Sequence, residues 1–150
     1  MSTIFTIGYE QATQGAVVAA LREAGVEVLA DIRYLPLSRR PGFSKSSLRA
    51  AVEEAGIAYR HFRDLGTPAE GRAAARRGAH AELARIYAGQ LELPEAMKQM
   101  AELRALAEDK RVCLLCYERA AAECHRALLF DALFEDFERI DLEPELVVAG

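Results

Sequence analysis

Residues 26–33, VEVLADIR, are the stretch of sequence that decides the fold. A strand that is apolar along most of its length, instead of alternating between apolar and polar residues, is typical of a parallel sheet covered on both faces. The sequence EAG followed by Val or Ile stands at residues 23–26 and again at 54–57, where each glycine is expected to end a helix just before a strand. The chain therefore begins with strands and helices in alternation, which indicates an α/β protein.

The same criteria predict further strands at residues 4–9 (IFTIGY), 57–62 (IAYRHF) and 111–117 (RVCLLCY), the last being the most buried. Helices are predicted from Thr13 to about residue 24, from residue 44 or 46 to 56, and over residues 79–88, 94–108 and 123–137. Residues 66–78 are rich in Ala, Gly and Arg, which predicts an exposed loop that acts as a mobile lid or arm. This order of elements predicts a three-layer α/β fold with a mainly parallel sheet flanked by helices.

Composition indicates the number of domains and the class of partner. The 150 residues are 51% hydrophobic, which suits a single domain over residues 1–150. With 19 basic and 23 acidic residues the net charge is −4, so the chain as a whole has no bias toward nucleic acid. Residues 31–49 nevertheless contain five basic residues and one acidic residue, whereas residues 131–150 contain seven acidic residues and one basic residue. We therefore expect a local anion site and an acidic C-terminal tail over about residues 139–150.

The cysteines and the first residues indicate the compartment. The start, MSTIFTIGYE, shows no charged leader followed by a long apolar stretch, and no apolar run reaches the roughly 18 residues of a membrane span. We therefore expect a cytoplasmic protein that does not associate with a membrane. In that compartment cysteines are more often buried, catalytic or metal-bound than disulfide-linked, and Cys113, inside a predicted strand, is expected to be buried.

The predicted strands deliver polar residues to their carboxyl ends, where folds of this type bind ligands. The groups suited to proton transfer or nucleophilic attack are the candidate catalytic residues Asp31, Cys116, Glu118, Cys124 and His125. The candidates for binding an anion or a substrate are Tyr9, Glu10, Arg33, Ser38, Arg39, Lys45, His61 and Arg126. Cys124 and His125 fall at the start of the last predicted helix, where free amides and the positive helix end favour thiolates and anions.

Structural roles remain open for several of these residues. Asp31 is either a buried partner of Arg33 or a general base. Cys124 and His125 either react or pack and cap the helix, and Cys116 is either core or reactive. A metal site at Cys116, Cys124 and His125 is not expected, because the sequence has no CxxC motif and adjacent side chains on a helix project about 100° apart.

Four motifs connect the sequence to a family. They are TIGYE at residues 6–10, DIRYLPLSRRPGFSK at 31–45, YRHFRDLG at 59–66 and LLCYERAAAECHR at 114–126. Their content and order resemble the DUF488 family, small bacterial and archaeal proteins whose biochemistry is largely undefined. The resemblance implies that the motifs share one site, and it names no reaction. The chain departs from the family pattern at Ile32, where Val is usual, and at Thr67, where a second Gly is usual.

The candidate residues favour an anion-binding enzyme over a pure docking surface. We expect a cysteine- or carboxylate-dependent hydrolase or transferase that acts on a phosphorylated small molecule, a nucleotide or a nucleic-acid base. The alternative is a non-catalytic module that senses a nucleotide or binds nucleic acid through the same basic pocket. Its basic face would be extended by Arg60, Arg63, Arg72, Arg76 and Arg77.

Other classes of site lack their motifs. Neither Cys116 nor Cys124 begins the C-x5-R loop of cysteine phosphatases and sulfurtransferases. The glycine-rich phosphate loops are missing, and the sequence identifies no cofactor. The expected partner is an anionic small molecule or nucleotide. Nucleic acid and a second copy of the chain, contacting through the Met and Leu faces of its helices, are further candidates.

Overall fold

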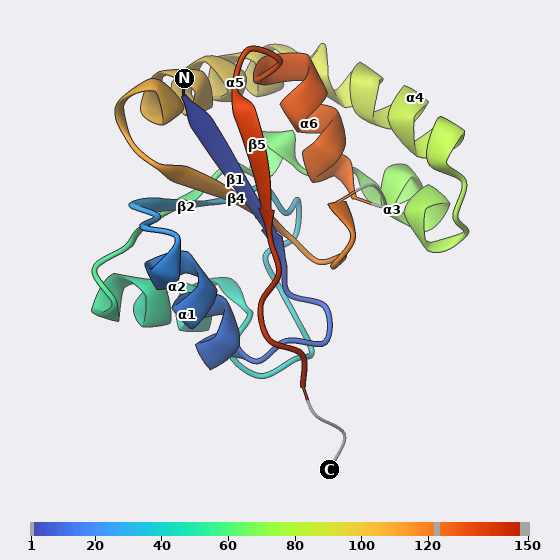
Figure 1. The fold of residues 1–150 in the computed structure, drawn as a ribbon. Helices are drawn as coiled ribbons and strands as arrows, with labels where there is room; N and C mark the ends of the chain where they lie inside the picture. The colour runs from blue at the N-terminus through green and yellow to red at the C-terminus, as the bar shows by residue number, and fades with distance from the viewer. Residues whose placement is uncertain (1, 122–123, 148–150) are drawn as a thin grey trace.

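The computed structural model describes residues 2–121 and 124–147 of the chain, which alternate strands and helices around one sheet (Figure 1). The elements in chain order are β1 (Thr3–Gly8), α1 (Gln14–Glu23), β2 (Val28–Asp31), α2 (Lys45–Glu54), β3 (Ala58–His61), the 3₁₀ helix η1 (Arg63–Leu65), α3 (Ala69–Arg76), α4 (His80–Leu91), α5 (Pro94–Asp109), β4 (Val112–Cys116), α6 (His125–Leu133) and β5 (Glu138–Leu142). The α/β class predicted from the sequence is confirmed.

The strands of the described chain form a five-stranded sheet in the order β3-β2-β4-β1-β5. Every neighbouring pair is parallel, and β4 lies in the middle, with Cys113 opposite Phe5 of β1 on one side and Leu29 of β2 on the other. The prediction of a mainly parallel sheet is therefore confirmed.

Both faces of the sheet are buried, as the apolar strands predict. All five residues of β4 are buried, and successive side chains point to opposite faces. Val112 and Leu114 belong to the core packed against α5 and α6, whereas Cys113 and Leu115 belong to the core packed against α1 and α2. Figure 1 shows α5 and α6 above the strands and α1 and α2 below them, which makes a three-layer fold.

The ends of the helices follow from local sequence. Thr13 caps α1, because its side-chain oxygen accepts a hydrogen bond from the N–H of Ala16 at 3.1 Å. The two EAG motifs end α1 and α2 through Gly25 and Gly56, whose φ angles of 73° and 82° are in the left-handed region that favours glycine. Each helix thus stops where the next strand must begin.

Three segments differ from the predictions. The last helix, predicted to reach residue 137, ends at Leu133. Residues 69–76 form helix α3 instead of an exposed loop; its buried residues are only Gly71 and Ala74, so it lacks the apolar periodicity that marks a helix in sequence. Residues 138–142, within the expected acidic tail, form the edge strand β5, which pairs with β1 and is tied to it by a 2.6 Å hydrogen bond from Thr6 to Asp141. The predicted start of the last helix at residue 123, and residues 148–150 of the tail, lie outside the described residues.

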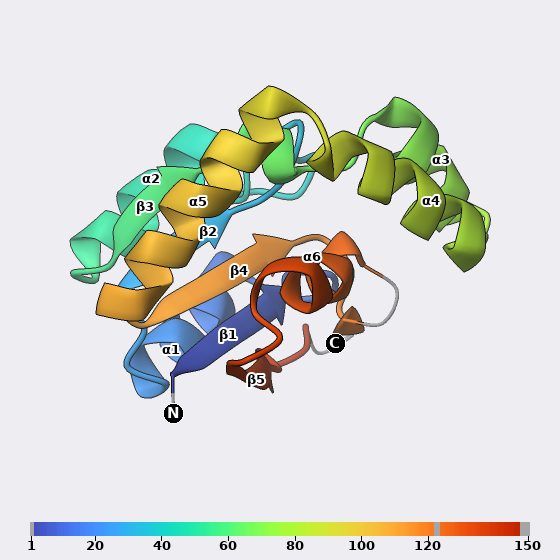
Figure 2. The same ribbon diagram turned by 90° about the horizontal axis from the view of Figure 1, so that it is seen from above.

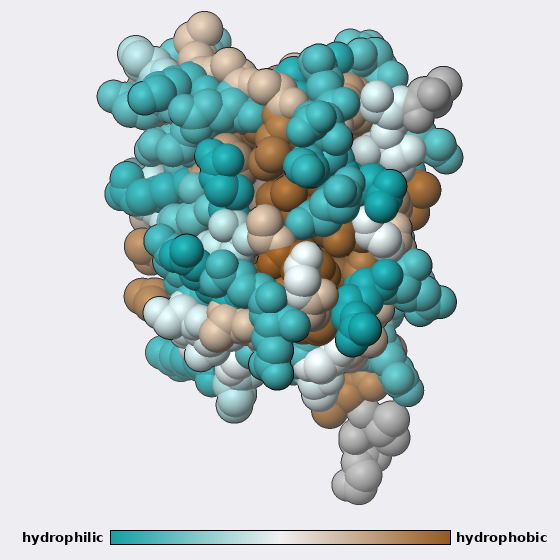
Figure 3. All heavy atoms as spheres, turned by 90° about the vertical axis from the view of Figure 1, so that its left-hand side faces the viewer, coloured by the Kyte–Doolittle hydropathy of each residue, from teal (hydrophilic) through white to brown (hydrophobic). Residues whose placement is uncertain are grey.

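Helices α3 and α4 pack against each other and project beyond the carboxyl ends of β1 and β4 (Figure 2). On the side of the molecule at the left of Figure 1, the hydrophobic residues gather mainly in the centre, with smaller hydrophobic patches at the margins (Figure 3). No helix in the described part of the chain is both long enough and apolar enough to cross a membrane.

Candidate functional site

A cavity of about 460 Å³ opens at the carboxyl ends of β1, β2 and β4. The chain leaves β1 and β2 toward the face covered by α1 and α2, but it leaves β4, which lies between them, toward the opposite face. Connections that depart to opposite faces leave a crevice between neighbouring strands, and parallel sheets bind their ligands there. The residues that line the cavity are Tyr9, Arg33, Tyr34, Leu35, Leu37, Ser38, Arg39, Thr67, Arg72, Ala75, Arg76, Leu83, Cys116, Tyr117, Glu118, Cys124 and His125.

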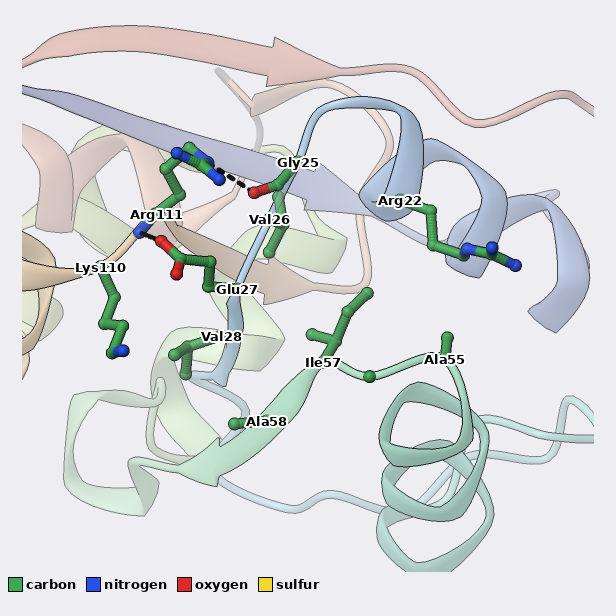
Figure 4. A pocket seen from close by; sticks show the side chains of 11 residues that line it. Arg22, Gly25, Val26, Glu27, Val28, Ala55, Ile57, Ala58, Lys110 and Arg111 are labelled. Atoms are coloured by element: carbon green, nitrogen blue, oxygen red, sulfur yellow. Dashed lines mark hydrogen bonds between the residues drawn. The ribbon is translucent and has the colours of Figure 1, made fainter.

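A second cavity, of about 500 Å³, lies at the amino ends of β2, β3 and β4 (Figure 4). Its polar groups connect the segment before β4 to the segment between α1 and β2. The N–H of Arg111 donates to the carboxylate of Glu27 at 2.9 Å, and Nε of Arg111 donates to the carbonyl of Gly25 at 2.6 Å. The first of these bonds lowers the pKa of Glu27. None of the candidate residues lines this cavity in the described structure, so we assign the candidate site to the cavity at the carboxyl ends.

Asp31 and Arg33, at the end of β2, form a buried ion pair. Arg33 donates from Nε and Nη2 to the two carboxylate oxygens at 2.8 and 2.7 Å, and the hydroxyl of Tyr59 donates to the same carboxylate. Nη1 of Arg33 donates to the carbonyl of Phe43 at 2.6 Å and to the hydroxyl of Tyr9 at 3.3 Å. Burial acts to lower the pKa of Arg33, but Asp31 and Tyr9 outweigh it and raise that pKa. Arg33 therefore holds the loop after β2 in place, and Asp31 neutralises and orients the guanidinium of Arg33.

The floor of the cavity contains two cysteines. Cys116 is the last residue of β4 and Cys124 is the N-cap of α6, and the structure joins their sulfurs as a disulfide across Cα atoms 7.1 Å apart. The expectation of unpaired cysteines is wrong for this pair, because the start of α6 returns beside the end of β4. It is confirmed for Cys113, which is free and buried, and burial raises its pKa.

His125 links this cysteine pair to β2. Its Nε2 lies 2.7 Å from the carbonyl oxygen of Ile32, and its Nδ1 lies 3.6 Å from the sulfur of Cys124. Because a carbonyl oxygen can only accept, Nε2 carries the proton and Nδ1 presents its lone pair to the sulfurs. Burial lowers the pKa of His125 to about 4, so the imidazole is neutral near neutral pH. The ligand atoms of Cys116, Cys124 and His125 lie within 4.8 Å of one another, close enough to hold one metal ion.

Arg126 is fully buried and organises the segment after β4. Its Nη1 lies 2.9 Å from the sulfur of Cys116 and donates to the carbonyl of Glu118 at 2.5 Å, while Nη2 donates to the carbonyl of Arg119 at 2.8 Å. Burial lowers the pKa of Arg126, and its Nε has no hydrogen-bond partner among the described atoms. Arg126 does not line the cavity, so its charge acts on Cys116 from behind the floor.

Arginines from two separate segments form a positive wall of the cavity. Arg39 belongs to the loop after β2, whereas Arg72 and Arg76 lie one turn apart on α3. Arg72 donates to the carbonyl of Thr67 at 2.9 Å, and its guanidinium carbon lies 5.7 Å from the ring centroid of Tyr34. Arg39 and Arg76 are exposed to solvent. We call Arg39, Arg72 and Arg76 the arginine wall.

The structure brings most of the predicted site residues together. Those that line the cavity are Tyr9, Arg33, Ser38, Arg39, Cys116, Glu118, Cys124 and His125. Those that do not line it are Glu10, Asp31, Lys45, His61 and Arg126. Of these, Glu10 accepts from the N–H of Arg119 at 3.0 Å, the N–H of Lys45 donates to the carbonyl of Pro36 at 2.8 Å, and Nε2 of His61 lies 2.8 Å from the carbonyl of Arg33. These contacts support the loops around the cavity.

Sequence reasoning missed that Arg72 and Arg76 face this cavity, because it treated residues 66–78 as a loop and these arginines as an outer basic face. Their spacing of four residues in the segment AEGRAAAR is the signal that could have revealed them, since residues four apart share one side of a helix. Tyr34 and Tyr117, which follow β2 and β4, are further lining residues that were not predicted.

Comparison with known proteins gives a family but no reaction. The family model described as "Domain of unknown function DUF488" matches residues 13–133, which extend from the N-cap of α1 to the end of α6. No match to the chain was found among curated proteins. The matched range covers most of the 150 residues and every residue that lines the cavity at the carboxyl ends except Tyr9. The chain therefore belongs to the DUF488 family, a domain of unknown function.

Proposed function

We propose that the cavity at the carboxyl ends is the site of an enzyme acting on a phosphorylated small molecule, a nucleotide or a nucleic-acid base. The observation that carries this proposal is the convergence of the arginine wall, from two separate segments, on a cavity whose floor holds a cysteine pair and a neutral histidine. Planar guanidinium groups bind phosphate oxygens through two parallel N–H bonds, so this wall suits a phosphate group better than a neutral ligand.

The aromatic side chains supply a second element of recognition. Tyr34 and Tyr117 follow neighbouring strands and both line the cavity. A nucleobase stacks on aromatic rings, so a nucleotide would contact the tyrosines with its base and the arginine wall with its phosphate. The chemistry would come from the floor, with Cys124 in its reduced form as the nucleophile or Glu118 as the group that transfers a proton. Asp31, Glu10, Lys45, His61 and Arg126 act as positioning residues in this proposal.

Calorimetric titration of phosphate and a panel of nucleotides tests the anion site. Changing Arg39→Ala or Arg72→Ala should weaken binding by about 1–3 kcal/mol, which is typical of a charge-assisted hydrogen bond. The matched control is Arg49→Ala, an exposed arginine on α2 that pairs with Glu53 at 3.1 Å and does not line the cavity. Equal binding by all three variants and the unchanged protein would remove the arginine wall from the site.

A second measurement separates the enzyme from the binding module that the sequence left as an alternative. Turnover that disappears in Cys124→Ser or Glu118→Gln, while anion binding persists, supports an enzyme. The exposed Arg39 and Arg76 are the observation that favours nucleic-acid binding. Affinity for long DNA or RNA that falls steeply with salt, without turnover of any nucleotide tested, would favour that alternative.

A further inference from the structure

The three sulfur and nitrogen atoms at the cavity floor form a compact group. Sγ of Cys116, Sγ of Cys124 and a ring nitrogen of His125 lie within 4.8 Å of one another, and all three side chains line the cavity. Thiolate and imidazole are the ligands that zinc prefers in proteins. The histidine of this group is also held in one orientation, because its ring is hydrogen-bonded to the backbone at the end of β2.

The hydrogen bond from Nε2 of His125 to the carbonyl of Ile32, at 2.7 Å, determines which nitrogen is available. With the proton on Nε2, the lone pair of Nδ1 points toward the sulfur of Cys124, 3.6 Å away. Histidines that bind metals commonly donate their other ring N–H to a backbone carbonyl or a carboxylate, which fixes the tautomer and the ring orientation. His125 already has this arrangement.

A metal site was not expected from the sequence, partly because Cys124 and His125 are adjacent and would point in different directions on a helix. The structure removes that objection, since Cys124 is the N-cap and its backbone is extended, with φ −127° and ψ 152°. Its side chain therefore does not follow helical spacing relative to His125. The Cα atoms of Cys116 and Cys124 are 7.1 Å apart, wider than the roughly 5.5–6 Å typical of disulfides, which leaves room for an ion between two reduced sulfurs.

We propose that, when Cys116 and Cys124 are reduced, they and His125 bind a borderline or soft divalent cation such as zinc. Two thiolates neutralise the charge of the ion, and the N–H of Arg126 beside the sulfur of Cys116, at 2.9 Å, stabilises the thiolate as an outer hydrogen bond. Three protein ligands leave one tetrahedral position, which opens into the cavity because every ligand lines it. That open position is typical of zinc sites that act on a ligand and not of purely structural ones.

The disulfide and the metal complex exclude each other, because the disulfide removes both thiolates. Binding of the ion to the reduced protein displaces the two thiol protons. The proposal goes beyond the anion site and does not depend on it, since the arginine wall supplies no metal ligand.

Cobalt(II) is a spectroscopic probe of this site. Reduced, chelator-treated protein titrated with cobalt should develop thiolate-to-cobalt charge-transfer absorption and the visible bands of tetrahedral cobalt, saturating at one ion per chain and reversed by zinc. Cys124→Ser and His125→Gln should each lower the affinity more than about 10-fold, because even outer-shell partners change metal affinity by about 10–100-fold. The matched control is Cys113→Ser in the same strand as Cys116, which should bind as the unchanged protein does. Oxidised protein should not bind.

X-ray absorption at the zinc edge of the unchanged, reduced protein needs no variant. It should show two sulfur neighbours and two lighter ones, the nitrogen of His125 and an oxygen in the open position. An oxygen-only shell, or cobalt affinity that is the same in Cys124→Ser and Cys113→Ser, would overturn the proposal and leave adventitious surface binding as the explanation. Arg39→Ala should retain cobalt affinity while losing phosphate affinity. The metal site and the anion site can therefore fail separately.

Discussion

Changing Asp31→Asn should destabilise the protein strongly, because it leaves a buried positive charge without its partner. Asp31 is fully buried and Arg33 is 6% exposed, and the carboxylate accepts two hydrogen bonds from that guanidinium. Removing one partner of a buried ion pair costs about 3–5 kcal/mol. Asparagine has nearly the same shape as aspartate, so the loss would come from charge and hydrogen bonding and not from a cavity.

This magnitude is a large part of the roughly 5–15 kcal/mol by which folded proteins are stable. For a chain of this length it corresponds to a fall in Tm of roughly 6–20 °C, since each kcal/mol lowers Tm by about 2–4 °C. Thermal and urea unfolding at neutral pH measure it. The matched control is Glu53→Gln, which breaks an exposed pair with Arg49 on α2 and should change stability by less than about 0.5 kcal/mol.

A double variant tests whether the loss arises from the pair. Combining Asp31→Asn with Arg33→Met removes the uncompensated charge, so the combined loss should be smaller than the sum of the single losses by about 0.5–3 kcal/mol. Additive losses, or a loss below about 1 kcal/mol for Asp31→Asn alone, would refute the assignment of Asp31 as the structural partner of Arg33. Loss of activity without loss of stability would instead give Asp31 the general-base role that the sequence left open.

Three further outcomes are expected. Gly8→Ala should lower the free energy of unfolding, measured in urea, by at least about 1–3 kcal/mol, because the added Cβ would overlap the backbone carbonyl of Glu118. The control is Gly15→Ala in α1, whose Cβ meets no atom within 4 Å and which should be neutral or stabilising. Because burial raises the pKa of Cys113, its alkylation should stay slow even at a pH where exposed thiols react fully, and Cys124 should be labelled first after reduction, as mass spectrometry would show. Amide exchange over residues 66–78 should be faster than in β4, and equal protection would contradict a mobile role for α3.

The central part of the fold was predictable because its signals are local or periodic. The apolar stretches of β2 and β4 predicted burial on both faces, and Thr13 and Gly25 marked the ends of α1. Helix α3 and strand β5 were missed for physical reasons. The buried residues of α3 are Gly71 and Ala74, too small to give an apolar pattern, and β5 is an edge strand held by backbone pairing, whose exposed charges are typical of a tail.

The place of the candidate site was predictable because parallel strands meet at one edge, but the roles of its residues were not. Asp31 and Arg33 stand two apart at a strand end, and only the structure shows that they pair with each other and that Arg33 lines the cavity whereas Asp31 does not. Arg76 lines the cavity because residues 69–76 form helix α3, which the sequence did not predict. The extended backbone of Cys124 depends on the exact residue at which α6 begins, and sequence patterns place helix ends only to within a few residues.

The cavity has a buried floor and an exposed wall, so substitutions in the two places give different kinds of information about its function. Cys116, His125 and Arg126 are buried and hydrogen-bonded to the sheet and to the segment after β4, so substitutions there alter chemistry and stability together. Arg39 and Arg76 are exposed, and substitutions of surface residues usually change stability by less than about 0.5 kcal/mol. Loss of ligand binding in Arg39→Ala or Arg76→Ala therefore reports on recognition alone, whereas a floor variant is informative only beside its measured stability.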